Sequence, residues 1–218
     1  MEVKGVNNIT ILKEGYPLIF GALAVTLLIG YLFGPIFAVL PALITAFITF
    51  FFREPYRPVE EDDSILYSPA DGTVMAVDQF YDDEFLHAEA KKVTIFLSIF
   101  NVHTNRSPMH GVVKYMRYTC GGFEPAYKGS APVVNERMAI GLENGRNRVL
   151  VVQIAGILAR RIVSWTSLGK DLAQGQTYGM IKFGSSTELI MPEDVEVLVR
   201  KGDKVKGGIT IIGRQIAE

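Results

Sequence analysis

A small polar stretch, Gly184-Ser185-Ser186, stands between two apolar, strand-like runs near the C-terminus. Its simplest interpretation is a tight turn, because glycine relieves backbone strain and serine hydrogen-bonds locally. A serine directly after a glycine also permits a reaction, since its oxygen can attack the unobstructed carbonyl carbon of that glycine. The resulting ester can eliminate, which breaks the chain and converts Ser185 into an N-terminal pyruvoyl group. Such a ketone withdraws electrons without any bound coenzyme.

Few side chains in this sequence could activate such a serine. A serine hydroxyl is a weak nucleophile and needs a base, which a histidine oriented by an aspartate can supply. Of the three histidines, His87, His103 and His110, the second ends a long apolar run, where side chains leave the core. Asp71 precedes a glycine at the start of an alternating run, a pattern that alone is typical of a plain turn. Asp71, His103 and Ser185 follow one another in the chain, but the G-x-S-x-G pattern of hydrolases is absent from the sequence.

Other kinds of site have weaker support. A metal site could combine His103, His110 and Asp71, but no two histidines have the spacing of a helical metal motif, and we expect no metal. The single cysteine, Cys120, excludes an internal disulfide and a zinc site built on paired cysteines. The net charge of −1 predicts no attraction to nucleic acid.

The elements that must position these residues begin with an uncharged N-terminal block. No Asp, Glu, Lys or Arg occurs between Tyr16 and Phe52, and the block divides at Gly34 into two runs of eighteen residues, 16–33 and 35–52. As helices they would each be about 27 Å long, close to the roughly 30 Å hydrocarbon layer of a membrane. A soluble helix normally has a polar stripe, which neither run has. We therefore expect residues 1–52 to be a membrane anchor, with Pro41 interrupting its second half.

Positive charges at both ends of this block indicate its orientation. Lys4 and Lys13 precede it, Arg53 and Arg57 follow it, and the link between its halves is uncharged. The positive-inside rule then places both ends, and the rest of the chain, on the cytoplasmic side of the cell membrane.

After a linker at residues 53–68, the remainder is expected to form a single mainly β domain, residues 69–218, of sandwich or barrel type. Short apolar runs separated by Gly, Asn and Asp are typical of such folds. The predicted strands are 72–78, 91–100, 112–117, 148–154, 161–165, 179–182, 187–190, 195–199 and 209–212.

The chain resembles the phosphatidylserine decarboxylases, specifically the short, membrane-anchored type that includes archaetidylserine decarboxylases. The similarity runs from about Phe52 to Gly213. Each of its motifs is weak alone, and it is their order and spacing that carry the resemblance: "FFREPYRP", "SPADGTV", "FLSIFNVHTNRSP", "GGFEPA", "NERMAI", "VQIAG", "GQTYGMIKFGSSTELIMP" and "KGDKVKGG".

This resemblance implies self-cleavage between Gly184 and Ser185, giving chains 1–184 and 185–218 that stay together as a heteromer. The second chain would begin with the covalent pyruvoyl cofactor. The resemblance also implies a membrane phospholipid as substrate, a Schiff base between its serine amine and the pyruvoyl ketone, and loss of CO₂ to leave the ethanolamine lipid. His103 would protonate the α-carbon, and Asp71 would support Ser185 during self-processing, through a histidine or directly. Members of the family often pair, which makes a homodimer possible, and the sequence leaves the oligomeric state open.

One position departs from the family's pattern. Familiar bacterial members have His-x-x-His after the equivalent strand, whereas this sequence has His103-Thr-Asn-Arg106. Either His103 serves both self-processing and decarboxylation, or processing relies on Asp71 with other help. Arg106 and Arg137 are candidates for holding the substrate's phosphate or carboxylate, because arginine is the preferred partner of such groups.

The alternative hypothesis is a non-catalytic β domain on a membrane hairpin, acting as a binding or carrier module. The tail "VRKGDKVKGGITIIG" has the strand and Gly-Asp turn pattern of swinging-arm carriers. This alternative predicts an uncut chain and, for a carrier, mass added to a lysine.

Overall fold

The computed structural model describes residues 8–124, 134–145, 147–156, 161–182 and 185–215. These residues belong to two compact units, the first ending at Tyr56 and the second beginning at Arg57.

The first unit is dominated by two apolar helices, α1 (Tyr16–Phe33) and α2 (Pro35–Phe51). Gly34 joins them with a φ of 94°, in the left-handed region that glycine adopts without a steric penalty. Pro41 lies inside α2, which continues on both sides of it, so the expected interruption of the second run is wrong. Proline lacks an N–H, so this position loses one i→i−4 hydrogen bond, and the rest of α2 remains helical.

The two ends of this helical segment meet in a small sheet. Strand β1 (Ile9–Ile11) leads through the 3-10 turn η1 (Lys13–Gly15) into α1, and β2 (Arg53–Pro55) follows α2 and pairs antiparallel with β1. In the described part of the chain, one helical span, Lys13–Phe33, is long and apolar enough to cross a membrane, while Pro35–Phe51 is apolar but shorter.

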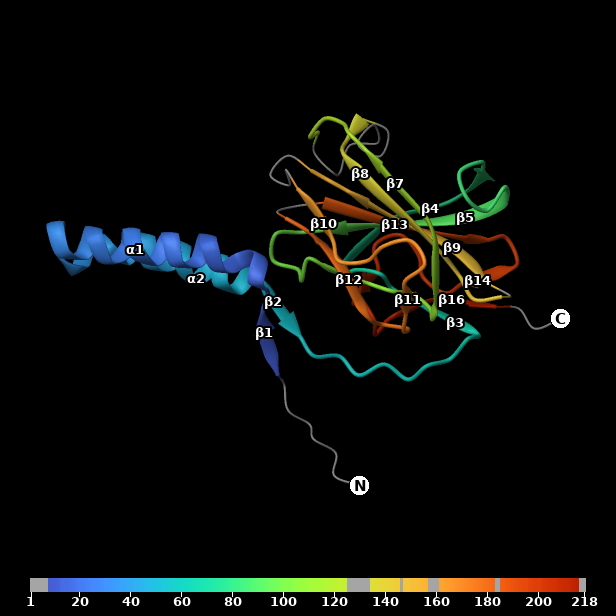
Figure 1. The fold of residues 1–218 in the computed structure, drawn as a ribbon, viewed down its shortest axis with the longest axis horizontal. Coiled ribbons are helices and arrows are strands. Elements are labelled where there is room, and N and C mark those ends of the chain that lie inside the picture. Colours follow the sequence, from blue (N-terminus) through green and yellow to red (C-terminus); the bar gives the residue numbers. More distant parts are fainter. Residues whose placement is uncertain (1–7, 125–133, 146, 157–160, 183–184, 216–218) are drawn as a thin grey trace, which may run out of the picture. The chain divides into compact units, whose positions relative to one another are not determined.

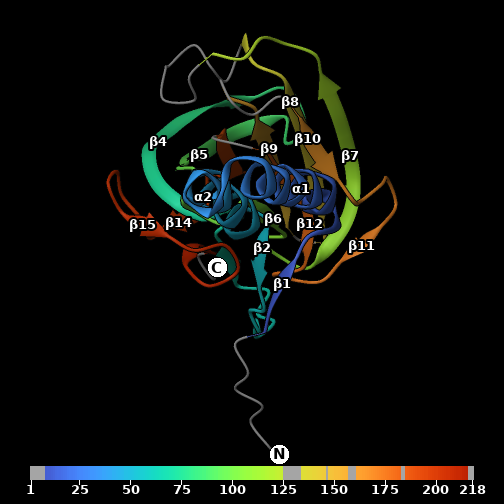
Figure 2. The ribbon, with the colours of Figure 1, turned by 90° about the vertical axis from the view of Figure 1, so that its left-hand side faces the viewer.

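The second unit consists of antiparallel strands around one eight-stranded sheet that curls into a half-barrel (Figures 1 and 2). The order across this sheet is β11 (Asp171–Leu172), β7 (Gly111–Thr119), β8 (Arg137–Glu143), β9 (Arg148–Ile154), β13 (Ser185–Pro192), β5 (Ala88–Leu97), β4 (Gly72–Asp82) and β15 (Lys204–Val205). Two three-stranded sheets complete the unit, in the orders β10 (Ile162–Ser164), β12 (Thr177–Ile181), β6 (Thr104–Arg106) and β14 (Val195–Val197), β16 (Ile211–Gln215), β3 (Ile65–Tyr67).

The central strands of the large sheet, β9 and β13, are buried on both faces, and alternation along the strands supplies a separate apolar cluster to each face. On β13, Leu189 and Met191 belong to the larger core cluster, whereas Ile190 between them packs in the smaller cluster with Phe85 and Leu150. This burial explains why β9, with the sequence RVLVVQI, is a nearly continuous apolar run.

The mainly β, barrel-like fold class with an apolar helical N-terminus is confirmed. The predicted strand 148–154 coincides with β9, but the predicted strand 91–100 ends early, at Leu97. The reason is local, since the Asn101 side chain accepts a hydrogen bond from the Ser98 N–H at 2.9 Å and turns the chain there. The segment 53–68, expected as a linker, contains β2 at its start and β3 near its end.

Candidate functional site

Strand β13 carries the predicted cleavage position at its first residue, inside the large sheet. Ser185 pairs with Leu97 of β5, and Ser186 pairs with Phe96 of β5 on one side and Ile154 of β9 on the other. Gly184, the other half of the predicted scissile bond, lies outside the described residues.

Both serines are fully buried, and neither hydroxyl has a hydrogen-bond partner among the described residues. Because side chains alternate along a strand, Ser185 shares a face with Thr187 and Ser186 shares the other face with Glu188. Leaving a buried hydroxyl unpaired costs about 1–3 kcal/mol. Two adjacent hydroxyls of this kind are unusual in a native core and indicate a functional position.

His103 lies between β5 and β6 with its side chain buried. Its Nδ1 atom is 3.0 Å from the carbonyl oxygen of Asn101, which can only accept, so Nδ1 carries the proton and the neutral ring keeps its lone pair on Nε2. The His103 carbonyl oxygen accepts a bond from the Ile181 N–H at 3.1 Å, at the end of the strand that leads toward Ser185. The site therefore contains a histidine whose tautomer suits a general base.

The carboxylate of Asp71 is held by an arginine to which the sequence analysis assigned no such role. Arg57 donates to its two oxygens at 2.5 and 2.8 Å, and the Gly207 N–H donates to Oδ1 at 2.8 Å. The Arg57 and Asp71 side chains are only 9% and 12% exposed. Arg57 belongs to the "FFREPYRP" motif, which was the available signal for its importance. The support of Ser185 by Asp71 stays a prediction.

Asp71 is brought to this end of the sheet by the glycine that follows it. A Cβ atom on Gly72 would lie 2.2 Å from the Phe96 carbonyl oxygen, so only glycine permits β4 to approach β5 this closely. Thr73 pairs with Phe96, and Phe96 pairs with Ser186. With about 4.8 Å between neighbouring strands, the start of β4 lies roughly 10 Å from the start of β13.

Arg137 lies at the same end of the sheet on the other side of β13. It pairs with Ile154, which pairs with Ser186, so it is also two strands away from that serine. Arg106 is different. It is 5% exposed, and its Nη1 donates to the Gly175 carbonyl oxygen at 3.1 Å, which favours a structural role. Substrate binding by either arginine stays a prediction.

A cavity of about 420 Å³ opens at this end of the sheet. Three chain segments line it, with the residues Asp71, Gly72, Thr73, Ser98, Phe100, Asn101, Lys204, Val205 and Lys206. Because Asn101 both lines the cavity and holds His103, the cavity connects Asp71 with the histidine's supporting loop.

A buried chain of polar side chains beside Ser185 was not foreseen. Asn105 of β6 donates to the Thr187 hydroxyl at 2.9 Å and accepts a bond from the Gln153 side-chain amide at 2.8 Å. All three residues are fully buried. These bonds join β6, β9 and β13 two residues after Ser185, and the isolated glutamine in the apolar "VVQIAG" was their signal in the sequence.

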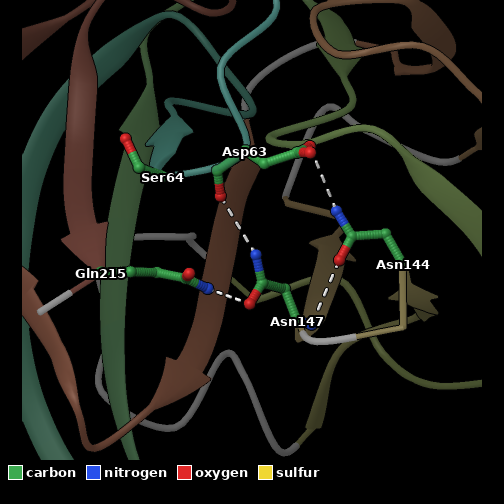
Figure 3. Close-up of a pocket in the computed structure, with 5 residues that line it drawn as sticks. All are labelled: Asp63, Ser64, Asn144, Asn147 and Gln215. Atoms are coloured by element: carbon green, nitrogen blue, oxygen red, sulfur yellow. Dashed lines mark hydrogen bonds between the residues drawn. The ribbon is translucent and has the colours of Figure 1, made fainter. Parts of the chain in front are cut away.

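A second cavity, also of about 420 Å³, lies at the opposite end of β8 and β9, lined by Asp63, Ser64, Asn144, Asn147 and Gln215 (Figure 3). There the polar groups bind one another. The Asn147 side chain donates to the Asp63 carbonyl oxygen at 3.1 Å, its oxygen accepts a bond from Gln215, and its backbone N–H donates to Asn144 at 3.1 Å.

Two further titratable groups lie outside these cavities. Burial raises the pKa of Glu188 on β13, and the Lys92 ammonium, 3.6 Å away, opposes that shift. His110 lies at the surface with Nε2 3.1 Å from Oδ1 of Asp171, rather than beside Asp71 as a joint metal site would require. Within the described ranges, no group of three or more His, Cys, Asp or Glu side chains could hold a metal ion.

Comparison with known proteins gives a consistent result. Residues 44–213 match the family model described as "Phosphatidylserine decarboxylase". The chain is 53% identical over 166 residues to a phosphatidylserine decarboxylase proenzyme of Carboxydothermus hydrogenoformans, covering 76% of this chain and 78% of the relative. It is 45% identical over 205 residues to a protein of the same name from Symbiobacterium thermophilum, covering 94% and 95% of the two chains.

Proposed function

The chain belongs to the phosphatidylserine decarboxylase family, whose members are decarboxylases, and we propose that it acts through a pyruvoyl group made from Ser185. Its substrate would be phosphatidylserine or archaetidylserine, and its products the ethanolamine lipid and CO₂. The observation that carries the proposal is the buried Ser185 hydroxyl at the start of an internal strand, without a hydrogen-bond partner among the described residues. Membership of this family favours the enzyme hypothesis over that of a non-catalytic binding or carrier module.

Self-processing starts when the Ser185 oxygen attacks the Gly184 carbonyl carbon. The peptide C–N bond breaks, the nitrogen of residue 185 takes a proton, and an ester joins the two residues. Removal of the α-proton of residue 185 then expels Gly184 as a carboxylate and leaves a dehydroalanine. After tautomerisation to an imine, water replaces its nitrogen, and ammonia leaves behind a ketone.

His103 is the base that we assign to the serine hydroxyl. Its Nδ1 lies 3.0 Å from the Asn101 carbonyl oxygen and donates to it, so Nε2 is the ring nitrogen that we assign to take the serine proton. Arg57 and Asp71 bind each other, and both bind Gly207, so the pair ties the start of β4 to the segment after β15 and so maintains the shape of this end of the sheet.

The surroundings of residue 185 suit a ketone. The buried Ser185 hydroxyl has an O–H donor without a partner among the described residues, and a ketone has no such donor. The pyruvoyl group supplies a carbonyl for the substrate amine and an electron sink for the pair released with CO₂. His103 in its protonated form then donates a proton to the substrate's α-carbon, so one histidine serves both reactions.

The proposal extends to the membrane. Large apolar side chains of α1 and α2 are exposed, as for Leu27 (65%), Tyr31 (88%) and Ile36 (74%). In water such a surface would be unfavourable, and a lipid layer removes it from water. We place both helices in the cell membrane, with the β domain on the cytoplasmic side, where the lipid headgroup is within reach.

Intact-protein mass spectrometry tests the central step. The wild-type protein should give two polypeptides of roughly 20 and 4 kDa, from an average residue mass of about 110 Da. Borohydride should trap the smaller one covalently with an aminophospholipid. Ser185→Ala should remain one polypeptide without activity, while Ser186→Ala, its matched control, should still be cut. An uncut wild-type chain with an unmodified Ser185 would contradict the mechanism, and comparing turnover of diacyl and ether-linked serine lipids would identify the backbone.

A further inference from the structure

We propose that Lys204 and Lys206 form an anion subsite for the phosphodiester of the lipid headgroup. The inference rests on the proposed function, since it assigns part of the same substrate to a particular place in the cavity beside Asp71.

The two lysines lie on either side of Val205, with Lys204 in the edge strand β15 and Lys206 directly after it. Lys204 pairs with Thr73 and Val205 with Gly72 of β4, and Val205 packs in the core. Lys206 begins the turn after this strand, where its carbonyl oxygen accepts hydrogen bonds from the Ile209 and Thr210 N–H groups at 3.0 and 2.9 Å. Both lysines are exposed, and both line the 420 Å³ cavity.

The positive charge of this pair is not neutralised within the described part of the chain. Neither ammonium takes part in an ion pair or side-chain hydrogen bond there. Among the described residues that line the cavity, Asp71 is the one carboxylate, and Arg57 already neutralises it. The cavity therefore has an unbalanced charge of about two, which matches an anionic ligand.

The phosphodiester suits this position better than the substrate's carboxylate. Decarboxylation removes the charge of the carboxylate, so cations holding it would stabilise the ground state more than the transition state and slow the reaction. The phosphodiester keeps its charge throughout, so lysines holding it bind substrate and transition state equally well. Lysine binds phosphate as a point charge and needs no planar geometry.

The rest of the cavity is consistent with a headgroup joined to an apolar tail. Its volume lies in the range of ligand pockets, roughly 300–1,000 Å³. Phe100, 64% exposed, lines the same cavity and offers an apolar contact for the part of the lipid beyond the phosphate. Arg106 and Arg137, the sequence-based candidates for holding the phosphate or carboxylate, are not among the lining residues.

Kinetics of Lys204→Gln/Lys206→Gln test the assignment. With a short-chain serine phospholipid in neutral detergent micelles, KM should rise about tenfold or more while kcat changes less than about twofold, the pattern of lost uniform binding. Self-cleavage should remain complete. Lys201→Gln, which removes an exposed lysine of the same tail outside this cavity, should leave both constants unchanged. An unchanged KM in the double variant, an equal effect of Lys201→Gln, or an increased kcat would overturn the assignment.

Binding to the uncut Ser185→Ala protein separates this inference from the proposed function, because it needs neither cleavage nor turnover. Calorimetric titration with glycerophosphoserine should show binding that the two glutamines weaken about tenfold. Inorganic phosphate at matched ionic strength serves as the second probe. Binding of inorganic phosphate without binding of glycerophosphoserine would identify a free-phosphate site and overturn the headgroup assignment.

Discussion

The two cavities at opposite ends of the large sheet have the same volume, about 420 Å³, and opposite chemistry. Beside Gln215, amide and carbonyl groups of neighbouring loops hydrogen-bond one another (Figure 3). At the Ser185 end, the described residues leave two ammoniums and two buried serine hydroxyls without partners. Because buried polar groups are normally paired, the groups around the first cavity are complete as they stand, whereas the two buried serines at the other end of the sheet are not. Volume alone therefore does not identify a functional site.

Of the substitutions at the two ends of the sheet, replacing His103 should have the greatest effect on turnover. In His103→Gln, an amide replaces the ring, and proton transfer is lost. Turnover per cut enzyme should fall at least about 100-fold, within the usual contribution of general acid–base catalysis. Gln215→Ala at the other cavity is the control and should keep wild-type turnover. A His103→Gln enzyme that keeps more than a tenth of the activity would exclude the assigned role.

Asp71 should show the next largest effect, through stability. Asp71→Asn leaves Arg57 buried without a counter-charge, and losing one partner of such a pair destabilises by about 3–5 kcal/mol. Arg57→Gln/Asp71→Asn should recover part of this loss. Urea unfolding followed by Trp165 fluorescence, in a Ser185→Ala background that keeps every variant uncut, measures both. Equal stability of the single variant and its parent would show that the pair does not hold this end of the sheet.

Asn105 and Asn147 allow the same substitution to be tested at each end of the large sheet. Asn105→Ala leaves the Thr187 and Gln153 groups unpaired, and Asn147→Ala does the same to groups around Gln215, so each should destabilise the protein by about 1–3 kcal/mol. Only Asn105→Ala should also slow self-cleavage, measured as the fraction of uncut chain over time. Slower cleavage in both variants would mean that cleavage follows overall stability rather than local positioning.

The smallest expected effect concerns pH and Glu188, between the two ends of β13. Burial raises the pKa of Glu188 above its ordinary value of 4.5, so the folded chain holds this proton more tightly than the unfolded chain. Its contribution to stability is then full below pH 4.5 and is lost as pH rises through the folded pKa. Glu188→Gln, which mimics the protonated group, should gain stability relative to wild type as pH rises above 4.5. Urea midpoints at several pH values measure this difference, and a constant difference would contradict it.

The sequence was sufficient for those features that depend on local pattern. Alternation and turn residues predicted the mainly β class, and the uncharged block predicted the apolar helices. Strand β8 (Arg137–Glu143) was missed, because "RMAIGLE" contains an arginine, a glycine and a glutamate among few β-branched residues. Its place in the sheet comes instead from pairing with β7 and β9.

The site was harder to predict, because its contacts join residues distant in sequence. The partners of Asp71 are Arg57 and Gly207, which are 14 and 136 residues away. No spacing rule gives such pairs, since they depend on how β4, β5 and β15 are arranged. The same holds for Asn105, whose partners Gln153 and Thr187 come from strands that meet only in the folded sheet.

The position of β13 also has a consequence for the proposed scission. This strand is bonded to β5 from Ser185 to Pro192 and to β9 on its other side, and the segments that follow it enter two sheets as β14, β15 and β16. A fragment that begins at residue 185 is therefore interwoven with the remainder and can depart only if the whole domain unfolds. Maturation would alter the covalent chemistry at one buried point and leave the architecture as it was.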